Sequence, residues 1–458
     1  MKYERLRCGM ADPIVTEPVG DVDNPSAFSP EELGFMCGIE VHQQLATGKL
    51  HSRQPGVLYD VTIDTVPDLW PRFQRRLRAA RGEGGAIDIA ARFESRRNRS
   101  FVYVQSPNAG LIELDEQPPL PHDRDAVEIA LTVSALLEAK PVTMLQTMRK
   151  TVVDGSNTSG FQRTSLISVD GVLQTKTGPV GIDVLCLEED SARKLDTVST
   201  ANGEKVIYNL DRLGLPLIEI ATSPDVVSPE HAQETSKALG RCLRQTRKVR
   251  RGLGSIRQDL NVSLACGDRV EIKGCQDLSW IPRIIRLEMA RQLHFYRLAN
   301  ELRQSMDLPP LPPDRRLDDS SVEQEVSLSV HKRLPLVLED VSQCFAACDS
   351  QMVRSGLDKG SVMLALPLPG LSGKFGVKAM DVEGAQLPRL GRELAGAAKL
   401  AGVKGVFHSD ELPAYGIDLE QVNLVRTQLS LDDADGFVLC LAPKWQAELA
   451  LESVLDRA

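Results

Sequence analysis

Apolar and polar side chains alternate with a period of two in the segment at residues 254–274. Of all the features of the sequence, this pattern most restricts the possible folds. The apolar positions are Ile256, Leu260, Val262 and Leu264, and the polar ones are Arg257, Asp259, Asn261 and Ser263. A turn follows at 265–268, and residues 269–274 return with Val270 and Ile272 inward. Because side chains alternate along a strand, the segment predicts an antiparallel hairpin with one apolar and one polar face. A solvated sheet face explains the polar residues, and so does a site that holds a phosphorylated substrate.

Three other strand-like segments carry acids or a histidine. Glu40 and His42 lie two residues apart in the alternating segment 34–42 and share a face. Three consecutive acids at 188–190 follow the apolar stretch 182–187, and Glu219 interrupts the apolar segment 217–221. An unpaired carboxylate is costly to bury, so these acids need a metal, an arginine or a substrate as partner.

A loop rich in glycine, serine and threonine spans residues 154–164 and ends in Gln162, Arg163 and Thr164. Its backbone N–H groups are suited to holding a phosphate, but it lacks the G-K-[ST] ending of a Walker A motif. The alternative is an ordinary loop.

Composition excludes several classes of protein. The 458 residues are 42% hydrophobic and 26% charged, which excludes a mainly disordered, collagen-like or coiled-coil chain. No apolar run approaches the length of a membrane span, and the N-terminus has no secretory signal. Nine scattered cysteines without a C-x-x-C motif indicate reduced thiols and a cytoplasmic location. The net charge of -9 argues against a strongly basic, sequence-independent nucleic-acid binder.

The chain divides, by pattern, into four parts. Residues 1–33 have no apolar period and are expected to form a flexible extension. Strand-rich sequence from 34 continues to 307, including helices expected after Ser228 and over about 282–303. Dense proline at 308–321 breaks the helix and predicts a linker over 308–334. Alternating apolar segments from 335 to 458 predict a second domain.

Several long motifs together resemble the GatB/GatE family of tRNA-dependent amidotransferase subunits, over about residues 34–458. In the first domain they are GIEVHQQL (38–45), DGSNTSGFQRT (154–164), LEED (187–190), RLGLPLIEIATSPD (212–225), RRGLGSIRQDLNVSL (250–264) and VEIKGCQDL (270–278). In the second they are LPLPGLSGKFG (366–376) and AGVKGVFHSDELPAYGI (401–417), which resemble the aspartyl-tRNA-synthetase-like insertion domain of the archaeal E-type subunit. The resemblance implies an α+β fold: a cradle domain with a largely antiparallel sheet, then an α+β insertion domain.

The resemblance also implies a reaction and its participants. ATP phosphorylates the side chain of glutamate misacylated onto tRNA(Gln), and ammonia from an asparaginase-like D subunit displaces the phosphate. It implies a hetero-oligomer in which E-type subunits self-associate. Mg²⁺ neutralises charge in such phosphoryl transfer. The implied magnesium ligands are Glu40, His42, Glu189 and Glu219, with side-chain heavy atoms expected within roughly 8 Å of one another. The implied substrate- and phosphate-binding residues are Gln162, Arg163, Arg257, Asp259, Asn261 and Lys273.

Two departures from the family pattern qualify this expectation. The cysteine pair common in the family is missing at 49–54, so no zinc is expected there. The family's E-type subunit continues well beyond residue 458, so the chain is expected to be truncated and to activate glutamate poorly alone. It is also expected to bind tRNA weakly and to form little amide even with the ammonia-producing partner. Local cations that support weak tRNA contact are Arg241, Arg244, Arg247, Lys248, Arg250 and Arg251. A B-type aspartyl/glutamyl amidotransferase subunit and a non-catalytic tRNA-binding or scaffold fragment stay open as alternatives.

Overall fold

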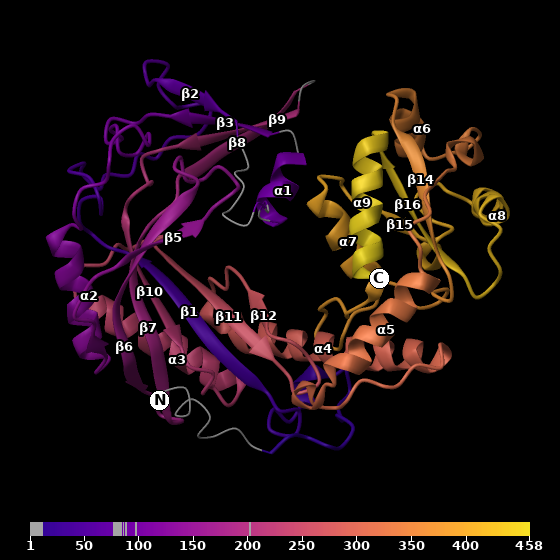
Figure 1. Ribbon diagram of the computed structural model, residues 1–458, viewed down its shortest axis with the longest axis horizontal. Helices are drawn as coiled ribbons and strands as arrows, with labels where there is room; N and C mark the ends of the chain where they lie inside the picture. Colours follow the sequence, from indigo (N-terminus) through magenta and orange to yellow (C-terminus); the bar gives the residue numbers. More distant parts are fainter. Residues whose placement is uncertain (1–11, 77–84, 86, 88, 97–98, 201–202) are drawn as a thin grey trace. The chain divides into compact units, whose positions relative to one another are not determined.

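The computed structural model describes residues 12–458 apart from 77–84, 86, 88, 97–98 and 201–202. The chain divides into two compact units, coloured along the sequence in Figure 1. One unit comprises residues 35–263 and 269–285, and we call it the sheet unit. The other comprises residues 1–34, 264–268 and 286–458, and we call it the C-terminal unit.

The sheet unit is built on an eight-stranded sheet in the order β12-β11-β1-β10-β7-β6-β4, with β5 also paired to β6. Every pairing in it is antiparallel. Its strands are β1 (Met36–Gln44), β4 (Lys140–Pro141), β5 (Thr147–Thr151), β6 (Phe161–Gln174), β7 (Pro179–Glu189), β10 (Pro216–Thr222), β11 (Ile256–Ser263) and β12 (Val270–Ile272). The hairpin predicted over 254–274 is confirmed as β11 and β12.

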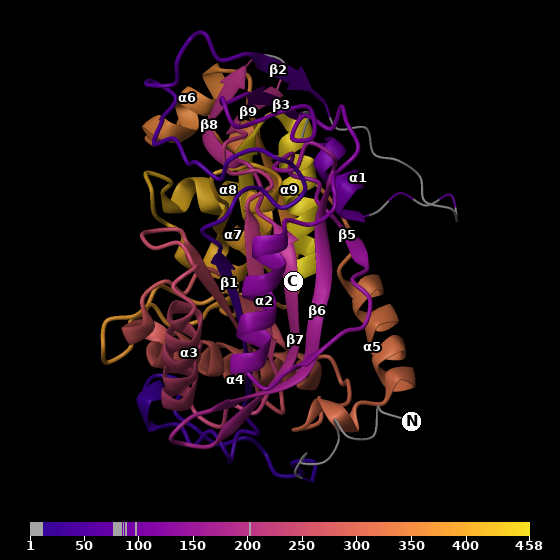
Figure 2. The same cartoon turned by 90° about the vertical axis from the view of Figure 1, so that its left-hand side faces the viewer.

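One face of this sheet is apolar and is covered by two helices. In register, Val41 opposes Ile220 and Ile220 opposes Leu185, and all three are buried. Helix α2 (Arg124–Leu136) packs on β6 and β7, and α3 (Pro229–Gln245) packs on β1 and β6 (Figure 2). The predicted start of α3 is confirmed: the Ser228 hydroxyl accepts the His231 N–H and caps the helix. Because side chains alternate, the residues between these apolar positions face the other way.

A second, four-stranded sheet in this unit has the order β2-β3-β9-β8. Its strands are β2 (Arg72–Arg75), β3 (Arg99–Val104), β8 (Arg193–Thr200) and β9 (Gly203–Asn209). β3 and β9 run parallel, whereas the other two pairings are antiparallel. Helix α1 spans Ile89–Arg96. Phe101, Tyr103 and Tyr208 form the aromatic part of the small core on this sheet.

The C-terminal unit contains a four-stranded antiparallel sheet, β13-β14-β16-β15. The strands are β13 (Glu339–Asp340), β14 (Val362–Leu368), β15 (Phe407–His408) and β16 (Gly436–Ala442). Its helices are most of α4 (Ile281–Ser305), together with α5 (Ser320–Arg333), α6 (Gln351–Asp358), α7 (Leu390–Leu400), α8 (Leu419–Gln428) and α9 (Lys444–Arg457). Apolar clusters that include Phe375 and Phe437 fill its interior. The fold is therefore a mixed α and β structure with mostly antiparallel sheets.

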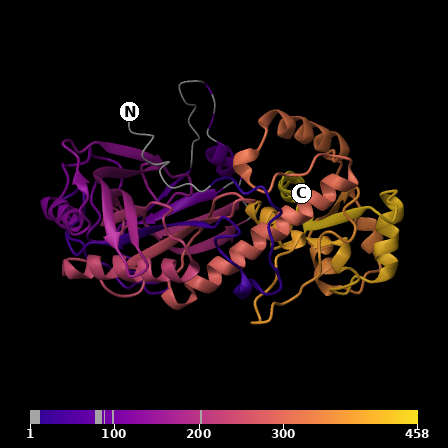
Figure 3. The ribbon, with the colours of Figure 1, turned by 90° about the horizontal axis from the view of Figure 1, so that it is seen from below.

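The unit boundary differs from the predicted linker at 308–334. The division falls within the long helix α4 (Ile281–Ser305), near residue 285, and α4 is seen along its length in Figure 3. Helix α4 ends at Ser305, before the prolines, with Asp307 in the left-handed conformation. The chain then returns along the helix, with the Leu311 N–H donating to Asn300 at 2.8 Å. Helix α5 occupies most of the rest of the predicted linker.

The N-terminal segment is also different from the free extension expected for residues 1–33. Residues 1–11 lie outside the described part of the chain. From residue 12 onward the segment packs within the C-terminal unit, where the side chains of Phe28 and Leu33 are buried. The Ile14 N–H also donates to the buried Asp314 carboxylate at 3.0 Å.

Candidate functional site

The polar face of the large sheet brings three of the predicted ligands together. His42, toward the C-terminal end of β1, lies opposite Glu219 of β10 on one side and Arg257 of β11 on the other. Glu40 is two residues earlier in β1 and therefore shares this face. One ligand atom from each of Glu40, His42 and Glu219 lies within 4.8 Å of the other two. Neighbouring strands therefore hold these three side chains at one place.

A fourth acid and a lysine complete this group, which we call the acid cluster: Glu40, His42, Lys150, Glu188 and Glu219. The Lys150 ammonium on β5 donates to Glu219 at 2.6 Å and to Glu188 at 3.1 Å. The His42 Nε2 lies 3.5 Å from a Glu188 oxygen and 3.4 Å from a Glu40 oxygen. The Glu188 side chain is only 2% exposed, whereas that of Lys150 is 43% exposed. The cluster thus extends from a buried carboxylate to a solvent-accessible ammonium.

Burial and like charge set the protonation of this cluster. Burial first, and then the nearby Glu219 charge, raise the pKa of Glu40 and that of Glu188 to about 7 each. Burial also acts to raise the pKa of Glu219, but the Lys150 hydrogen bond and charge outweigh it and the pKa lies below its ordinary value. Burial lowers the pKa of His42, so its imidazole favours the neutral form that a metal ligand requires. Protons on Glu40 and Glu188 relieve the repulsion among the three carboxylates when no cation does so.

The donor set fits a divalent cation. Three carboxylates face a single ammonium, so the fully ionised cluster carries excess negative charge. Carboxylate oxygens are the ligands that Mg²⁺ prefers, and Mg²⁺ also retains water, for which a partly exposed site leaves room. The histidine is a less typical ligand for Mg²⁺ than the carboxylates.

The structure does not bring Glu189 to this cluster, although the sequence analysis placed it there. Glu188 and Glu189 are consecutive in β7, so their side chains point to opposite faces of the sheet. Glu189 is buried on the other face, where the Arg163 guanidinium donates to it at 3.0 Å. Arg163 is therefore also absent from the polar face, and the neighbouring acid Glu188 occupies the position expected for Glu189.

The remaining predicted substrate-binding residues lie on the polar face. Gln162 opposes Lys150 in register, and its amide donates to the Glu189 carbonyl at 2.6 Å. Arg257 donates at 3.0 Å to Asp190, whose side chain is 1% exposed. Asp259 opposes Glu40 in register and accepts the Gly274 N–H at 2.9 Å.

The hairpin supplies two further polar groups beside Asp259. Asn261 opposes Gly38 of β1 and Glu271 of β12. The Lys273 ammonium lies 3.5 Å from Asp259 and 2.6 Å from Glu271, with 69% of the side chain exposed. The polar face of the hairpin thus continues directly from the acid cluster and ends in an accessible cation.

Two members of the cluster were missed by sequence reasoning. Glu188 was recoverable, because the alternation of buried Leu185 and Leu187 puts residues 186 and 188 on the polar face. Lys150 carries no such signal. It lies in a short strand with every residue exposed, whose pairing to β6 is visible only in the fold.

The chain is similar to known proteins over most of its length. The model of the GatB/GatE catalytic domain matches residues 35–329. The chain is 43% identical over 429 residues to the E subunit of glutamyl-tRNA(Gln) amidotransferase from Pyrococcus furiosus, covering 93% of this chain and 62% of that protein. The proteins of the same name from Thermococcus gammatolerans and Methanosarcina acetivorans are 42% and 40% identical, and in each case the match covers 94% of this chain. Those two matches cover 63% and 62% of the relatives themselves.

The chain thus spans under two thirds of the length of the curated relatives it matches. Among the described residues, none of the helices combines the length and the apolar composition needed to cross a bilayer. The match to the catalytic-domain model covers well over half of the chain and includes every residue of the acid cluster. The chain therefore belongs to the GatB/GatE family.

Proposed function

We propose that this chain carries the activation site of a glutamyl-tRNA(Gln) amidotransferase, which converts Glu-tRNA(Gln) to Gln-tRNA(Gln). The single observation that carries the proposal is the acid cluster at the middle of the sheet, bordered by the polar hairpin face. A side-chain carboxylate is a poor electrophile, so amide formation needs activation. Three clustered carboxylates, a neutral histidine and nearby cations suit a phosphoryl transfer from ATP.

The proposed reaction has two steps. The substrate's γ-carboxylate oxygen attacks the γ-phosphorus of ATP, which gives a γ-glutamyl phosphate and releases ADP. Ammonia then attacks the acyl carbon, phosphate leaves with the bond electrons, and the nitrogen loses a proton to give the amide. Mg²⁺ held by Glu40, His42 and Glu219, with Glu188 beside them, would neutralise phosphate charge during the first step.

The chain's own residues have distinct tasks in this proposal. Glu40 and Glu219 hold their carboxylates at fixed strand positions, so no loop has to close to form the cluster. Arg257 and Lys273 present cationic groups on the same face, where they orient phosphate oxygens. Asp190 holds Arg257 and Asp259 holds Lys273, and Asn261 is available to the substrate's polar groups.

The proposal extends to partners and to the second unit. Ammonia comes from an asparaginase-like D subunit, and the assembly is a cytoplasmic hetero-oligomer that contains self-associated copies of this chain. Residues 335–458, within the C-terminal unit, form the aspartyl-tRNA-synthetase-like insertion domain in this proposal. We expect no zinc at 49–54, because this stretch lacks the cysteine pair that would ligate it.

Trapping the activated intermediate tests the proposal. The chain is incubated with ATP, Mg²⁺ and Glu-tRNA(Gln), and hydroxylamine converts any γ-glutamyl phosphate to a hydroxamate while ADP is measured. We expect both products with the wild type and neither with Glu219→Gln, whereas Glu116→Gln, an exposed acid paired with Arg75, retains both. RNA binding without ADP release would support the non-catalytic alternative. Equal activation of Asp-tRNA(Asn) would support a B-type subunit.

A further inference from the structure

Helix α3 and the segment that follows it concentrate positive charge in an otherwise acidic chain. Residues 235–258 contain no aspartate or glutamate, although the whole chain has 63 acids against 54 lysines and arginines. The cations in this stretch are Lys237, Arg241, Arg244, Arg247, Lys248, Arg250, Arg251 and Arg257. Such segregation of charge marks a surface that attracts anions.

Two of these cations already have partners in the sheet unit. Arg250 donates to the backbone carbonyls of Leu45 and Gly56, and Arg257 pairs with Asp190. The others are exposed, and none forms an ion pair with a described residue. Their charge is therefore available to a ligand.

Three of the exposed cations line one side of α3, and we call them the α3 row: Lys237, Arg241 and Arg244. At 100° per residue they fall within a sector of about 60°, and at 1.5 Å per residue they span about 10 Å. The opposite side of the helix is buried through Leu239 and Leu243. The α3 row thus faces away from the sheet.

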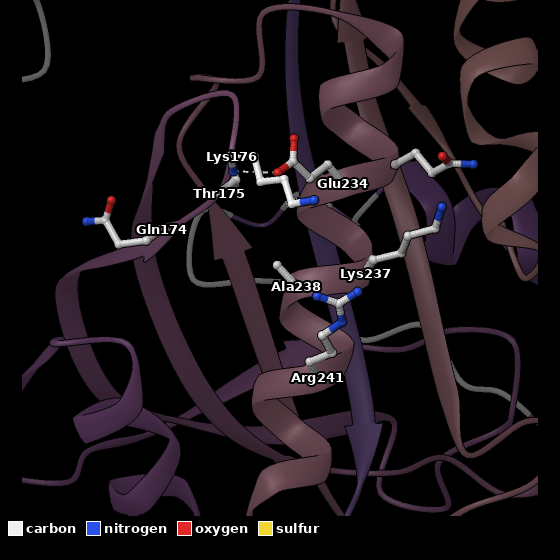
Figure 4. A pocket seen from close by; sticks show the side chains of 8 residues that line it. Gln174, Thr175, Lys176, Glu234, Lys237, Ala238 and Arg241 are labelled. Carbon is white, nitrogen blue, oxygen red and sulfur yellow. Dashed lines mark hydrogen bonds between the residues drawn. The ribbon is translucent and has the colours of Figure 1, made fainter.

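A hollow of about 460 Å³ lies at the start of this row (Figure 4). The turn between β6 and β7 contributes Lys176, whose side chain reaches toward α3, where Lys237 and Arg241 project from successive turns. Gln174 and Gln233 add amide groups to the lining. The lining of the hollow includes one acid, Glu234, whose carboxylate accepts the Lys176 backbone N–H and the Thr177 hydroxyl. It forms no ion pair with a described residue, and one carboxylate against Lys176, Lys237 and Arg241 leaves the hollow with a net positive charge.

Helix electrostatics do not account for this arrangement. Cations are favourable in the last turn of a helix, which explains Arg244. Lys237 lies in the middle of α3 and Lys176 lies on another element, so the helix dipole gives neither of them a comparable stabilisation. Repulsion among the cations is a cost to the fold that binding an anion removes.

We propose that the α3 row, together with Lys176 in the hollow, binds the phosphodiester backbone of an RNA. Phosphates follow one another every few ångströms along a nucleic-acid strand, so a row of about 10 Å contacts several of them. The described part of α3 exposes no large apolar side chain, whereas the core of a protein interface needs one, and this favours RNA over an acidic protein.

This inference rests on the proposed function only for the identity of the RNA, a tRNA. Helix α3 covers the apolar face of the large sheet, opposite the acid cluster. The α3 row therefore contacts RNA away from the reacting 3′ end. The segment after α3 lies beside the C-terminal end of β1, because the Arg250 backbone N–H donates to the Gln44 carbonyl. The acid cluster lies near the same end of that strand.

The test compares two triple variants of the chain. The first, Lys237→Ala/Arg241→Ala/Arg244→Ala, removes the α3 row. The matched control, Lys332→Ala/Lys359→Ala/Lys404→Ala, removes three exposed lysines of the C-terminal unit that have no ion pair with a described residue. Unacylated tRNA(Gln) is the probe, and its binding is followed by fluorescence anisotropy between about 50 and 200 mM salt.

We expect the first variant to bind the tRNA at least ~10-fold more weakly at low salt, with a salt slope reduced by about 2 to 3. The control keeps the wild-type affinity and slope. The charge-conserving variant Lys237→Arg/Arg241→Lys/Arg244→Lys restores both, and circular dichroism verifies that each variant is folded.

Wild-type affinity and slope in the first variant would overturn the inference. Unchanged tRNA binding with lost binding of the ammonia-producing partner would do so as well and would reassign the surface to a protein. Weakened tRNA binding in a chain that never activates glutamate would leave the inference standing and contradict the proposed function instead.

Discussion

Replacing Lys150 by methionine tests how much the positive charge in the acid cluster stabilises the fold. Its ammonium makes two charge-assisted hydrogen bonds, at 2.6 Å to Glu219 and 3.1 Å to Glu188. A hydrogen bond to a charged group contributes about 1.5–3 kcal/mol, and the lower end applies because 43% of the lysine side chain is exposed. We therefore expect Lys150→Met to lower the free energy of unfolding by about 2 kcal/mol in EDTA.

Magnesium should reduce this deficit. A bound divalent cation neutralises the same two carboxylates that Lys150 neutralises, and at 100 times its Kd it stabilises the folded state by about 2.7 kcal/mol. Mg²⁺ should raise the free energy of unfolding more in Lys150→Met than in the wild type, because Mg²⁺ does not compete with an ammonium group in the variant. Urea denaturation in EDTA and in Mg²⁺, followed by circular dichroism, measures both quantities. Hydrogen exchange in β1 assigns the transition to the sheet unit.

The matched control is Lys140→Met. Lys140 lies on β4 in the same sheet and pairs with Asp170 at 3.4 Å, but both side chains are mostly exposed. Its replacement should change the free energy of unfolding by less than about 1 kcal/mol, with no dependence on Mg²⁺. An Mg²⁺-independent deficit in Lys150→Met, or equal behaviour of the two variants, would refute the reasoning.

Two further predictions concern neighbouring acids and a buried anchor. Glu188→Gln should slow ATP-dependent ADP release at least ~10-fold. Glu189→Gln should mainly lower the free energy of unfolding, by about 3 kcal/mol, because it leaves buried Arg163 without its anion. Steady-state kinetics and urea denaturation separate the two effects, and equal kinetic losses would contradict the placement of Glu188 and Glu189 on opposite faces of the sheet. Hydrogen bonds from Arg316 lower the pKa of Asp314 to about 2, below its value of about 3.9 in an unfolded chain, so this carboxylate stabilises the fold fully above about pH 5 and loses that effect as the pH falls toward 2. Asp314→Asn should therefore cost about 2 kcal/mol at pH 7 and flatten the acid limb of the stability profile, and an unchanged profile would contradict this.

The fold was predictable where alternation and helix signals are undisturbed. The hairpin at 254–274 and the capped start of α3 after Ser228 follow from local pattern alone, and the structure has both. The boundary near residue 285 was not predictable in this way, because it lies inside the continuous helix α4. Helix periodicity reports burial along a stretch and carries no information on which unit provides the contact.

Three of the five residues in the acid cluster were predictable, whereas Glu188 and Lys150 were not predicted. Glu40 and Glu219 each have apolar neighbours on both sides, and His42 follows Glu40 by two residues, so the pattern identifies them individually. In a run of three acids, composition does not show whether Glu188 or Glu189 faces the cluster. That depends on which residues of β7 point to each face of the sheet. Gln162 and Arg163 were read as part of a loop, whereas β6 begins at Phe161 and sends them to opposite faces.

The register irregularity in β6 has a consequence for changes in chain length. Leu166 opposes Cys186 and Ser168 opposes Leu185, so Ile167 is an extra residue that the sheet accommodates as a bulge. It lies beyond Thr164, the residue that opposes Glu188, so a deletion of Ile167 would shift the distal part of the strand and leave the pairing beside the cluster in place. A one-residue deletion between Val184 and Glu188 of β7 would instead exchange the acids that face the cluster. Natural insertions and deletions, and loop grafts in engineered forms, should therefore accumulate on the far side of Ile167 and avoid the last five residues of β7.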